Sequence, residues 1–212
     1  PPLEQATTLW KQGSMLILAS RSPARKALLA GAGLAFEARD PDVNERLIEA
    51  NLAGESAETV ARRLAEAKAR GIGGDDAVIG ADQVLALGEE RLHKPASLAA
   101  AREQLLRLRG RTHVLHAGVA LAVGGEVVWS TTESAALTMR EFSEAELDGV
   151  LALEGNATLG SVGGYRLEGP SVQLFQRIEG DYFTILGLPL LQLLAALRRH
   201  VPLVLAGSRG FT

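Results

Sequence analysis

The chain of 212 residues contains no cysteine. This absence excludes a disulfide framework and a thiolate metal site, so any bound metal must be held by oxygen atoms or by histidine. Oxygen ligands suit hard cations such as magnesium. The absence of cysteine is also compatible with a reducing cytoplasm, and we expect a cytoplasmic protein.

An excess of positive charge is missing too. The chain has 22 Lys and Arg against 25 Asp and Glu, for a formal net charge of -3. This balance gives no overall attraction to nucleic acid or to an anionic membrane surface, so neither is expected as a partner. Every apolar stretch is interrupted within about 18 residues by charge, glycine or proline, which is too short to span a bilayer.

Several well-known catalytic motifs are absent. The chain has no G-x-x-x-x-G-K-[ST] loop, no H-E-x-x-H and no G-x-S-x-G, which excludes a P-loop ATPase and the zinc and serine hydrolases that carry the other two motifs. His113 and His116 are three residues apart on a predicted strand and therefore point to opposite faces. They are expected to be structural.

What is present fits one α/β domain with a hydrophobic core, since 47% of the residues are hydrophobic. We expect an added extension over residues 1–14, which lack a signal peptide pattern and end in Gly13-Ser14 before Met15, a domain over 15–200 and a tail over 201–212. Predicted helices and strands alternate. Helices are expected over 24–30, 57–70, 98–108, 143–155 and 189–199; strands over 15–19, 77–80, 112–123, 126–139 and 172–178, with a hairpin over 84–92 and a loop over 156–170.

The segment from Ser20 to Arg25 has the chemistry of an anion site. A predicted strand leads directly into a helix whose free N–H groups and dipole favour phosphate. Ser20 and Ser22 add hydroxyl groups, and Arg25 in the first turn carries a planar fork that matches two phosphate oxygens. The alternative is an ordinary helix start, because Ser-Pro opens many helices.

A carboxylate follows the predicted strand 77–80. Asp82 therefore lies where ligand crevices open in α/β sheets, and it can ligate magnesium or orient an attacking water. The alternative is a loop aspartate that accepts hydrogen bonds from nearby backbone. Lys94, before Pro95, and Lys68, near the end of a helix, are candidate phosphate ligands, although solvated lysines and favourable helix C-terminal charges are common.

The chain carries six ordered motifs, namely Leu18-Ala-Ser-Arg-Ser-Pro-Ala-Arg25, Arg63-Leu-Ala-Glu-Ala-Lys68, Gly80-Ala-Asp-Gln-Val84, Lys94-Pro95, Leu108-Arg-Gly-Arg-Thr-His113 and Leu186-Gly-Leu-Pro189. Taken together, these motifs resemble the Maf family. The resemblance covers nearly all of residues 15–199 and implies a fold like that of the inosine triphosphate pyrophosphatases, with a mixed twisted sheet, flanking helices and two lobes around a deep cleft. It also implies metal-dependent cleavage of a nucleoside triphosphate to the monophosphate and pyrophosphate, and dimers are common in such families.

Carried over residue by residue, the resemblance implies a catalytic and phosphate-binding site. Its members are Asp82 as metal ligand or general base, with Mg2+ or Mn2+ as the cation, and Ser20, Ser22, Arg25, Lys68 and Lys94 around the phosphates. Glu45 matches the acidic position in the loop after the second strand. Gln83 and Glu168, which would bind substrate, look more like the 7-methyl-GTP branch than the dTTP and UTP branch, which usually has threonine after the aspartate.

Three positions depart from the family pattern, namely Ala24 for a second arginine, His93 for glycine and Asn44 for aspartate. A bulky His93 is expected to narrow the pocket. The alternatives to 7-methyl-GTP are dTTP and UTP, or a broad house-cleaning activity. A rival of another class is a nucleotide-responsive regulator of cell division without turnover, against which the set of Asp82, Lys94 and Arg25 argues.

Overall fold

The computed structural model describes residues 15–202. The predicted extension over residues 1–14, and residues 203–212 of the predicted tail, lie outside this range. Between residues 15 and 202, no helix combines the length and the apolar character that crossing a membrane requires.

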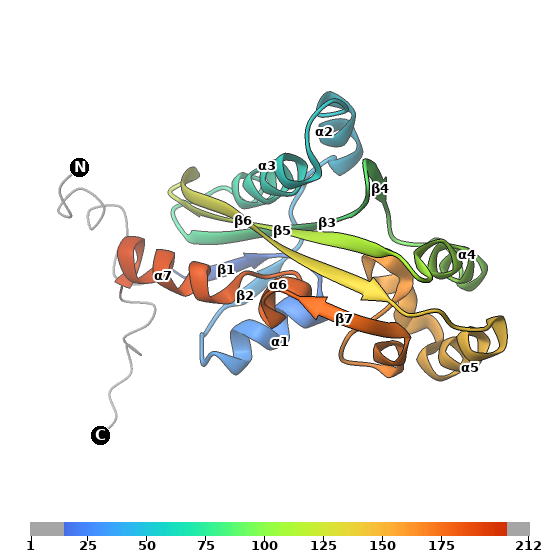
Figure 1. Ribbon diagram of the computed structural model, residues 1–212. Helices are drawn as coiled ribbons and strands as arrows, with labels where there is room; N and C mark the ends of the chain where they lie inside the picture. The colour runs from blue at the N-terminus through green and yellow to red at the C-terminus, as the bar shows by residue number, and fades with distance from the viewer. Residues whose placement is uncertain (1–14, 203–212) are drawn as a thin grey trace, which may run out of the picture.

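Seven strands in this part of the chain form one mixed sheet, with the order β2-β1-β3-β5-β6-β7 and with β4 paired to β3 (Figure 1). β1 pairs in parallel with β2 and β3, and the remaining pairs are antiparallel. The predicted α/β fold with flanking helices is confirmed. The strands are β1 (Leu16–Ala19), β2 (Glu37–Arg39), β3 (Ala77–Leu87), β4 (Glu90–Leu92), β5 (Thr112–Val123), β6 (Glu126–Met139) and β7 (Phe175–Glu179).

Helices lie on both faces and at one end of the sheet (Figure 1). One face carries α3 (Ala57–Arg70), beside which α2 (Glu45–Asn51) projects. The other carries α1 (Pro23–Gly31), α6 (Tyr182–Ile185) and α7 (Leu190–His200). The two remaining helices, α4 (Leu98–Leu108) and α5 (Glu144–Glu154), lie at the end where β6 finishes.

α3 packs unusually close to the sheet because two glycines face it. A Cβ on Gly80 of β3 would lie 2.0 Å from the Ala65 carbonyl oxygen, and a Cβ on Gly118 of β5 would lie 2.3 Å from that of Ala61. Small residues at these contacts let the helix backbone approach the strands directly. As a result, the last turn of α3 carries Lys68 to the surface of the sheet next to β3.

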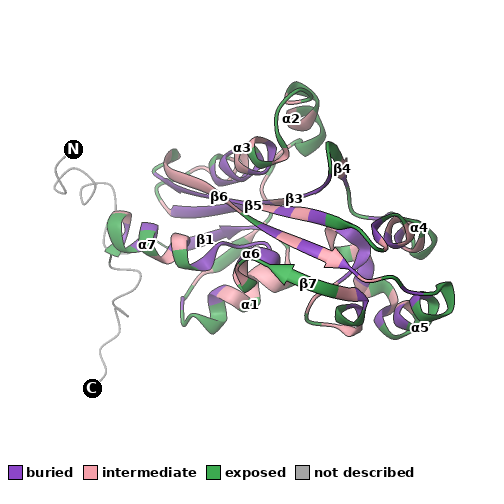
Figure 2. Cartoon of the chain, in the orientation of Figure 1, coloured by how far each residue is buried: buried purple, intermediate pink, exposed green. Residues whose placement is uncertain are grey.

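Buried side chains form separate clusters along the sheet, and Figure 2 shows the purple strands that contribute to them. One cluster joins Leu18, Ile79 and Leu121 of the central strands to Leu193 of α7. Another gathers at the opposite end around Leu105 of α4, with residues of β3, β5, β6 and α5. The arrangement in two lobes around a deep cleft stays a prediction.

Some predicted boundaries are wrong. The strand expected over 77–80 continues to Leu87, because Asp82 and Gln83 are strand residues despite their polarity. The expected strand 172–178 begins only at Phe175, since residues before it form a 3-10 turn. The loop over 156–170 lies largely in 3-10 turns, η1 (Gly155–Gly160), η2 (Val162–Gly164) and the start of η3 (Pro170–Leu174).

Candidate functional site

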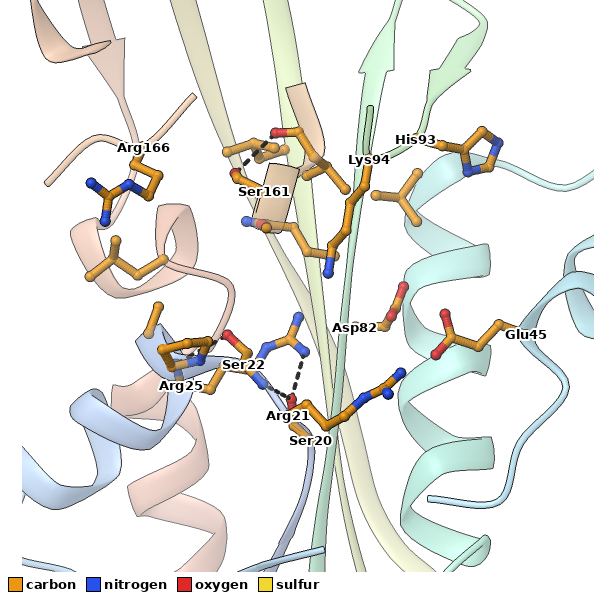
Figure 3. A pocket seen from close by; sticks show the side chains of 18 of the residues that line it. Ser20, Arg21, Ser22, Arg25, Glu45, Asp82, His93, Lys94, Ser161 and Arg166 are labelled. Carbon is orange, nitrogen blue, oxygen red and sulfur yellow. Dashed lines mark hydrogen bonds between the residues drawn. The ribbon is translucent and has the colours of Figure 1, made fainter. Parts of the chain in front are cut away.

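A gap beside β3 defines the candidate site. β1 pairs with β3 from Ala77 to Gly80, and β4 pairs with it only from Leu85 onwards. Among the described strands, none pairs with residues 81–84 on that side, and a pocket of about 920 Å³ opens there (Figure 3). Asp82 and Gln83 are consecutive residues of this segment and point to opposite faces of the sheet.

The predicted strand, turn and helix around Ser20 are confirmed, and they form one wall of the pocket. The Ser22 hydroxyl oxygen caps α1 by accepting a hydrogen bond from the Arg25 backbone N–H. The Ser20 hydroxyl oxygen accepts bonds of 3.2 Å from both the Ser22 N–H and the Arg25 guanidinium. The turn therefore holds both hydroxyl groups and the guanidinium close together.

Arg25 is anchored by backbone carbonyls from two distant segments. Its Nε donates to the Gly187 oxygen at 2.8 Å, and its Nη1 donates to the Ala81 oxygen at 3.0 Å. Gly187 has φ of +86°, a conformation that favours glycine. Burial lowers the pKa of Arg25, although Asp82 and Glu45 oppose the effect. The guanidinium is thus fixed in the pocket wall before any ligand enters.

Two carboxylates and one ammonium group meet on the other side of the gap. Lys68 Nζ lies 2.5 Å from Asp82 Oδ1 and 2.9 Å from Glu45 Oε1. The Lys68 and Asp82 side chains are only 9% and 13% exposed, whereas that of Glu45 is 52% exposed. Glu45 was expected in a loop, but it is the first residue of α2, whose N-cap is Asn44. The structure therefore joins three residues that are far apart in sequence.

The Lys94 side chain enters the pocket from the segment after β4. Figure 3 shows its amine pointing into the cavity, opposite Ser20. It makes no hydrogen bond or ion pair with any residue in the range 15–202. Burial lowers the pKa of Lys94, as does repulsion from Arg25 and Lys68. The neighbouring His93 also lines the pocket, but its ring is largely exposed and lies 3.9 Å from Glu49 of α2.

Gln83 and Glu168 line the pocket in different ways. The amide nitrogen of Gln83 donates to the backbone oxygens of Thr184 and Ile185 at 3.1 and 2.9 Å. Both amide hydrogens are therefore engaged, which leaves the amide oxygen as an acceptor. Glu168 lies exposed in a turn just before η3, as its predicted loop position suggested.

The turns around Glu168 are held by residues that sequence reasoning missed. Glu154 has a fully buried side chain, and its carboxylate accepts two hydrogen bonds from Arg166 and two from Ser171, at 2.9 to 3.0 Å. Burial disfavours its charge, but these bonds hold the pKa of Glu154 below its usual value. A carboxylate at the end of an apolar helix stretch was the only sequence signal.

A second buried polar contact lies next to these turns. His113 Nε2 and the Tyr165 hydroxyl are 2.7 Å apart, and Tyr165 lines the pocket. His113 is buried and His116 partly exposed, where it bonds to Ser134, which confirms that the two rings lie on opposite faces of β5. That both are structural stays a prediction.

The described part of this pocket offers two converging carboxylates for a hard cation, but no third His, Cys, Asp or Glu as a ligand. Within residues 15–202 no group of three or more His, Cys, Asp and Glu is placed to hold a metal. Glu45 and Asp82, however, both contact the same cationic atom, Lys68 Nζ. Two converging carboxylates match the way magnesium is bound, where waters and substrate phosphates complete the coordination.

Comparisons with known proteins match the chain over most of its length. The family model described as "Maf-like protein" matches residues 15–200. The 7-methyl-GTP pyrophosphatase of Brucella abortus is 47% identical over 87% of this chain and 96% of its own length. That of Rhizobium meliloti is 50% identical over 87% and 95%. A nucleoside triphosphate pyrophosphatase of Bradyrhizobium diazoefficiens is 50% identical over 90% and 96%.

Proposed function

The chain belongs to the Maf family, and we propose that it hydrolyses a nucleoside triphosphate to the monophosphate and pyrophosphate, with 7-methyl-GTP as its preferred substrate. The reaction class rests on the names of relatives that are 47 to 50% identical over most of their length. The preference for 7-methyl-GTP rests on two of those names and on the groups that line the pocket.

The observation that supports this function best is the convergence of Arg25, Lys68 and Lys94. They come from α1, from α3 and from the segment after β4, and their charges are close enough for Arg25 and Lys68 to lower the pKa of Lys94. Placing like charges together costs energy in the empty site, and a polyanion relieves that cost. A triphosphate is the polyanion that fits a family of nucleotide pyrophosphatases.

In the proposed reaction, a water oxygen attacks the α-phosphorus while its proton passes to the Asp82 carboxylate, and the bond from this phosphorus to the α–β bridging oxygen breaks. The pyrophosphate leaves with the bridging oxygen, and Lys94 and Arg25 neutralise its charge. A divalent cation at Asp82 and Glu45 would neutralise phosphate charge when bound. Ser20 and Ser22 offer hydroxyl groups to the same phosphates.

Two acceptor groups among the residues that line the pocket favour a guanine base. Gln83 has only its amide oxygen left, and Glu168 presents a carboxylate. Guanine offers N–H donors at N1 and N2, and methylation at N7 adds a positive charge that a carboxylate attracts. Thymine and uracil offer a single ring N–H between two carbonyl groups, which matches two acceptors less well.

A substrate screen with metal omission tests this proposal. Pyrophosphate release is measured for 7-methyl-GTP, GTP, dTTP, UTP, CTP and ITP with Mg2+, with Mn2+ and with a chelator. We expect kcat/KM for 7-methyl-GTP to exceed that for dTTP and UTP by at least about tenfold, or about 1.4 kcal/mol in transition-state binding, and no turnover with the chelator. Equal rates for all six would contradict the preference and favour a broad pyrophosphatase. Tight binding without turnover would favour a regulatory role.

A further inference from the structure

The arrangement of Lys68 points to an order of binding within this site. We propose that the Lys68 ammonium occupies the cation position between Glu45 and Asp82 in the nucleotide-free protein. A divalent metal then binds these two carboxylates only together with the triphosphate, whose phosphates bind the displaced Lys68 ammonium. This inference rests on the proposed function, because it assumes that a nucleotide and a metal share the pocket.

The contacts of Lys68 show why the metal is excluded at first. Its ammonium lies within 2.9 Å of one oxygen from each carboxylate, so it fills the position from which a cation would contact both. Lys68 and Asp82 are nearly buried, where the repulsion between an ammonium and a divalent ion is poorly screened. A metal can therefore bind this pair only after Lys68 has moved.

The pocket also offers Lys68 another partner. Arg25 and Lys94 mark where the phosphates are expected to lie, and Lys68 is close enough to Lys94 for its charge to lower the pKa of Lys94. The lysine side chain has a flexible four-carbon stem, so its ammonium can change partners while the helix stays fixed. α3 itself is held against β3 and β5 at Gly80 and Gly118, which makes a side-chain movement the available response.

Glu45 can adjust to the exchange more easily than Asp82. Asp82 belongs to a central strand that pairs with β5 at Gly118. Glu45 belongs to α2, a seven-residue helix without a single buried residue, so a small shift of this helix disturbs little packing. The pair is thus built from one fixed carboxylate and one that can follow the incoming cation.

The test is Mn2+ binding by electron paramagnetic resonance, without turnover. Binding is measured for the wild-type chain, Lys68→Met and Lys94→Met, each with and without a 7-methyl-GTP analogue whose α–β bridge is a methylene group. We expect the analogue to tighten Mn2+ binding to the wild-type protein by at least about tenfold, the size of a typical coupling between sites. Lys68→Met should bind Mn2+ about tenfold more tightly than the wild type without the analogue.

Lys94→Met is the matched control, because it removes one positive charge from the same pocket but no contact with a carboxylate. It should change Mn2+ affinity in the absence of the analogue much less than Lys68→Met does. An equal gain in Mn2+ affinity in the two variants would overturn the proposal, because it would show only a general effect of removing a positive charge. If Lys68→Met fails to fold, the wild-type protein still decides, since equal Mn2+ affinity with and without the analogue would also overturn it.

The outcome is separable from that of the proposed function. Mn2+ binding that depends on the analogue, in a protein that releases no pyrophosphate from any nucleotide, would keep the order of binding and remove the reaction. Pyrophosphate release by a protein that binds Mn2+ equally well without nucleotide would keep the reaction and remove the role of Lys68.

Discussion

The two ends of the pocket are built differently. At the phosphate end, Arg25, Lys68 and Asp82 belong to α1, α3 and β3, whose backbones are fixed by helix or sheet hydrogen bonds and by core packing. At the other end, which we call the base end, the wall between Ser161 and Glu168 consists of 3-10 turns and irregular chain. This wall is held by the buried carboxylate of Glu154 and by the contact of Tyr165 with His113.

Because of this difference, we expect the two ends to respond differently to substitutions. Groups on regular elements keep their positions when a neighbouring side chain is changed, so a substitution there removes mainly the chemistry of that group. Turns held by a few buried hydrogen bonds move when one bond is lost. We therefore expect changes at the phosphate end to lower kcat, and changes at the base end to raise KM.

The largest effect is expected for Asp82→Asn. The amide keeps the shape of the side chain but loses the negative charge, and we expect kcat to fall by about 10³-fold, as for the loss of one preorganised electrostatic group. Binding of a non-hydrolysable nucleotide should remain measurable by calorimetry. Asp148→Asn is the control, since Asp148 is paired with Arg102 on the exposed side of α5. Full activity of Asp82→Asn would remove this residue from the mechanism.

The next largest effect is expected for Gly80→Ala. The added methyl group would meet the Ala65 carbonyl oxygen and force α3, with Lys68, away from the sheet. Overpacking of this kind costs about 1 to 3 kcal/mol or more, and we expect a lower unfolding free energy together with lower kcat.

Gly149→Ala is the matched control for Gly80→Ala. This glycine lies exposed inside α5, with no atom within 4 Å of its added Cβ, so alanine should stabilise the helix by up to about 1 kcal/mol. The unfolding free energy of each variant is measured by urea unfolding, and kcat by steady-state assays. Unchanged kcat in a folded Gly80→Ala protein would contradict the link between helix position and catalysis.

The sequence predicts correctly those helices and turns that have a local pattern. The turn from Ser20 to Arg25 and the helix that carries Lys68 follow from local residue types and apolar spacing. The sequence places Asp82 just after the strand 77–80, whereas backbone pairing with β5 continues through it. The helix of Glu45 left no signal, since it buries no residue.

The base end was harder to predict for a physical reason. Glu154 and Ser171 are 17 residues apart, and His113 and Tyr165 are 52 apart, so neither pair forms a local pattern. Turns stabilised by single long-range hydrogen bonds lack the periodicity that marks helices and strands. A glycine-rich stretch was therefore predicted as a loop, without the partners that hold it.

Glu154→Gln tests the base end. All four groups that Glu154 binds are donors, so the NH2 of glutamine would face a donor and at least one bond would be lost. We expect KM for the nucleotide to rise by about tenfold, equivalent to about 1.4 kcal/mol, with kcat nearly unchanged.

Glu146→Gln is its control, because Glu146 lies on the same helix and bonds Ser143 and Arg140, neither of which lines the pocket. That variant should lower stability without changing KM. A fall in kcat at constant KM for Glu154→Gln would contradict a positioning role at the base end.

The last effect concerns the pH dependence of stability at the base end, and leaves activity aside. Burial lowers the pKa of His113 to about 4, against about 6.5 for an unfolded chain. Between these values the unfolded state binds more protons, so stability is complete above pH 6.5 and is lost as the pH falls towards 4. From pH 7 to pH 5, the loss due to His113 is about 2 kcal/mol.

Urea unfolding at pH 7 and pH 5 of the wild type and of His113→Phe isolates this contribution. Phenylalanine keeps a ring beside Tyr165 and Phe175 but does not titrate, so the variant should lose about 2 kcal/mol less than the wild type over this interval. Burial also lowers the pKa of His116, but that residue is present in both proteins and cancels in the comparison. Equal losses in both proteins would show that His113 is protonated in the folded state, and that solvent reaches the base end of the pocket as far as β5.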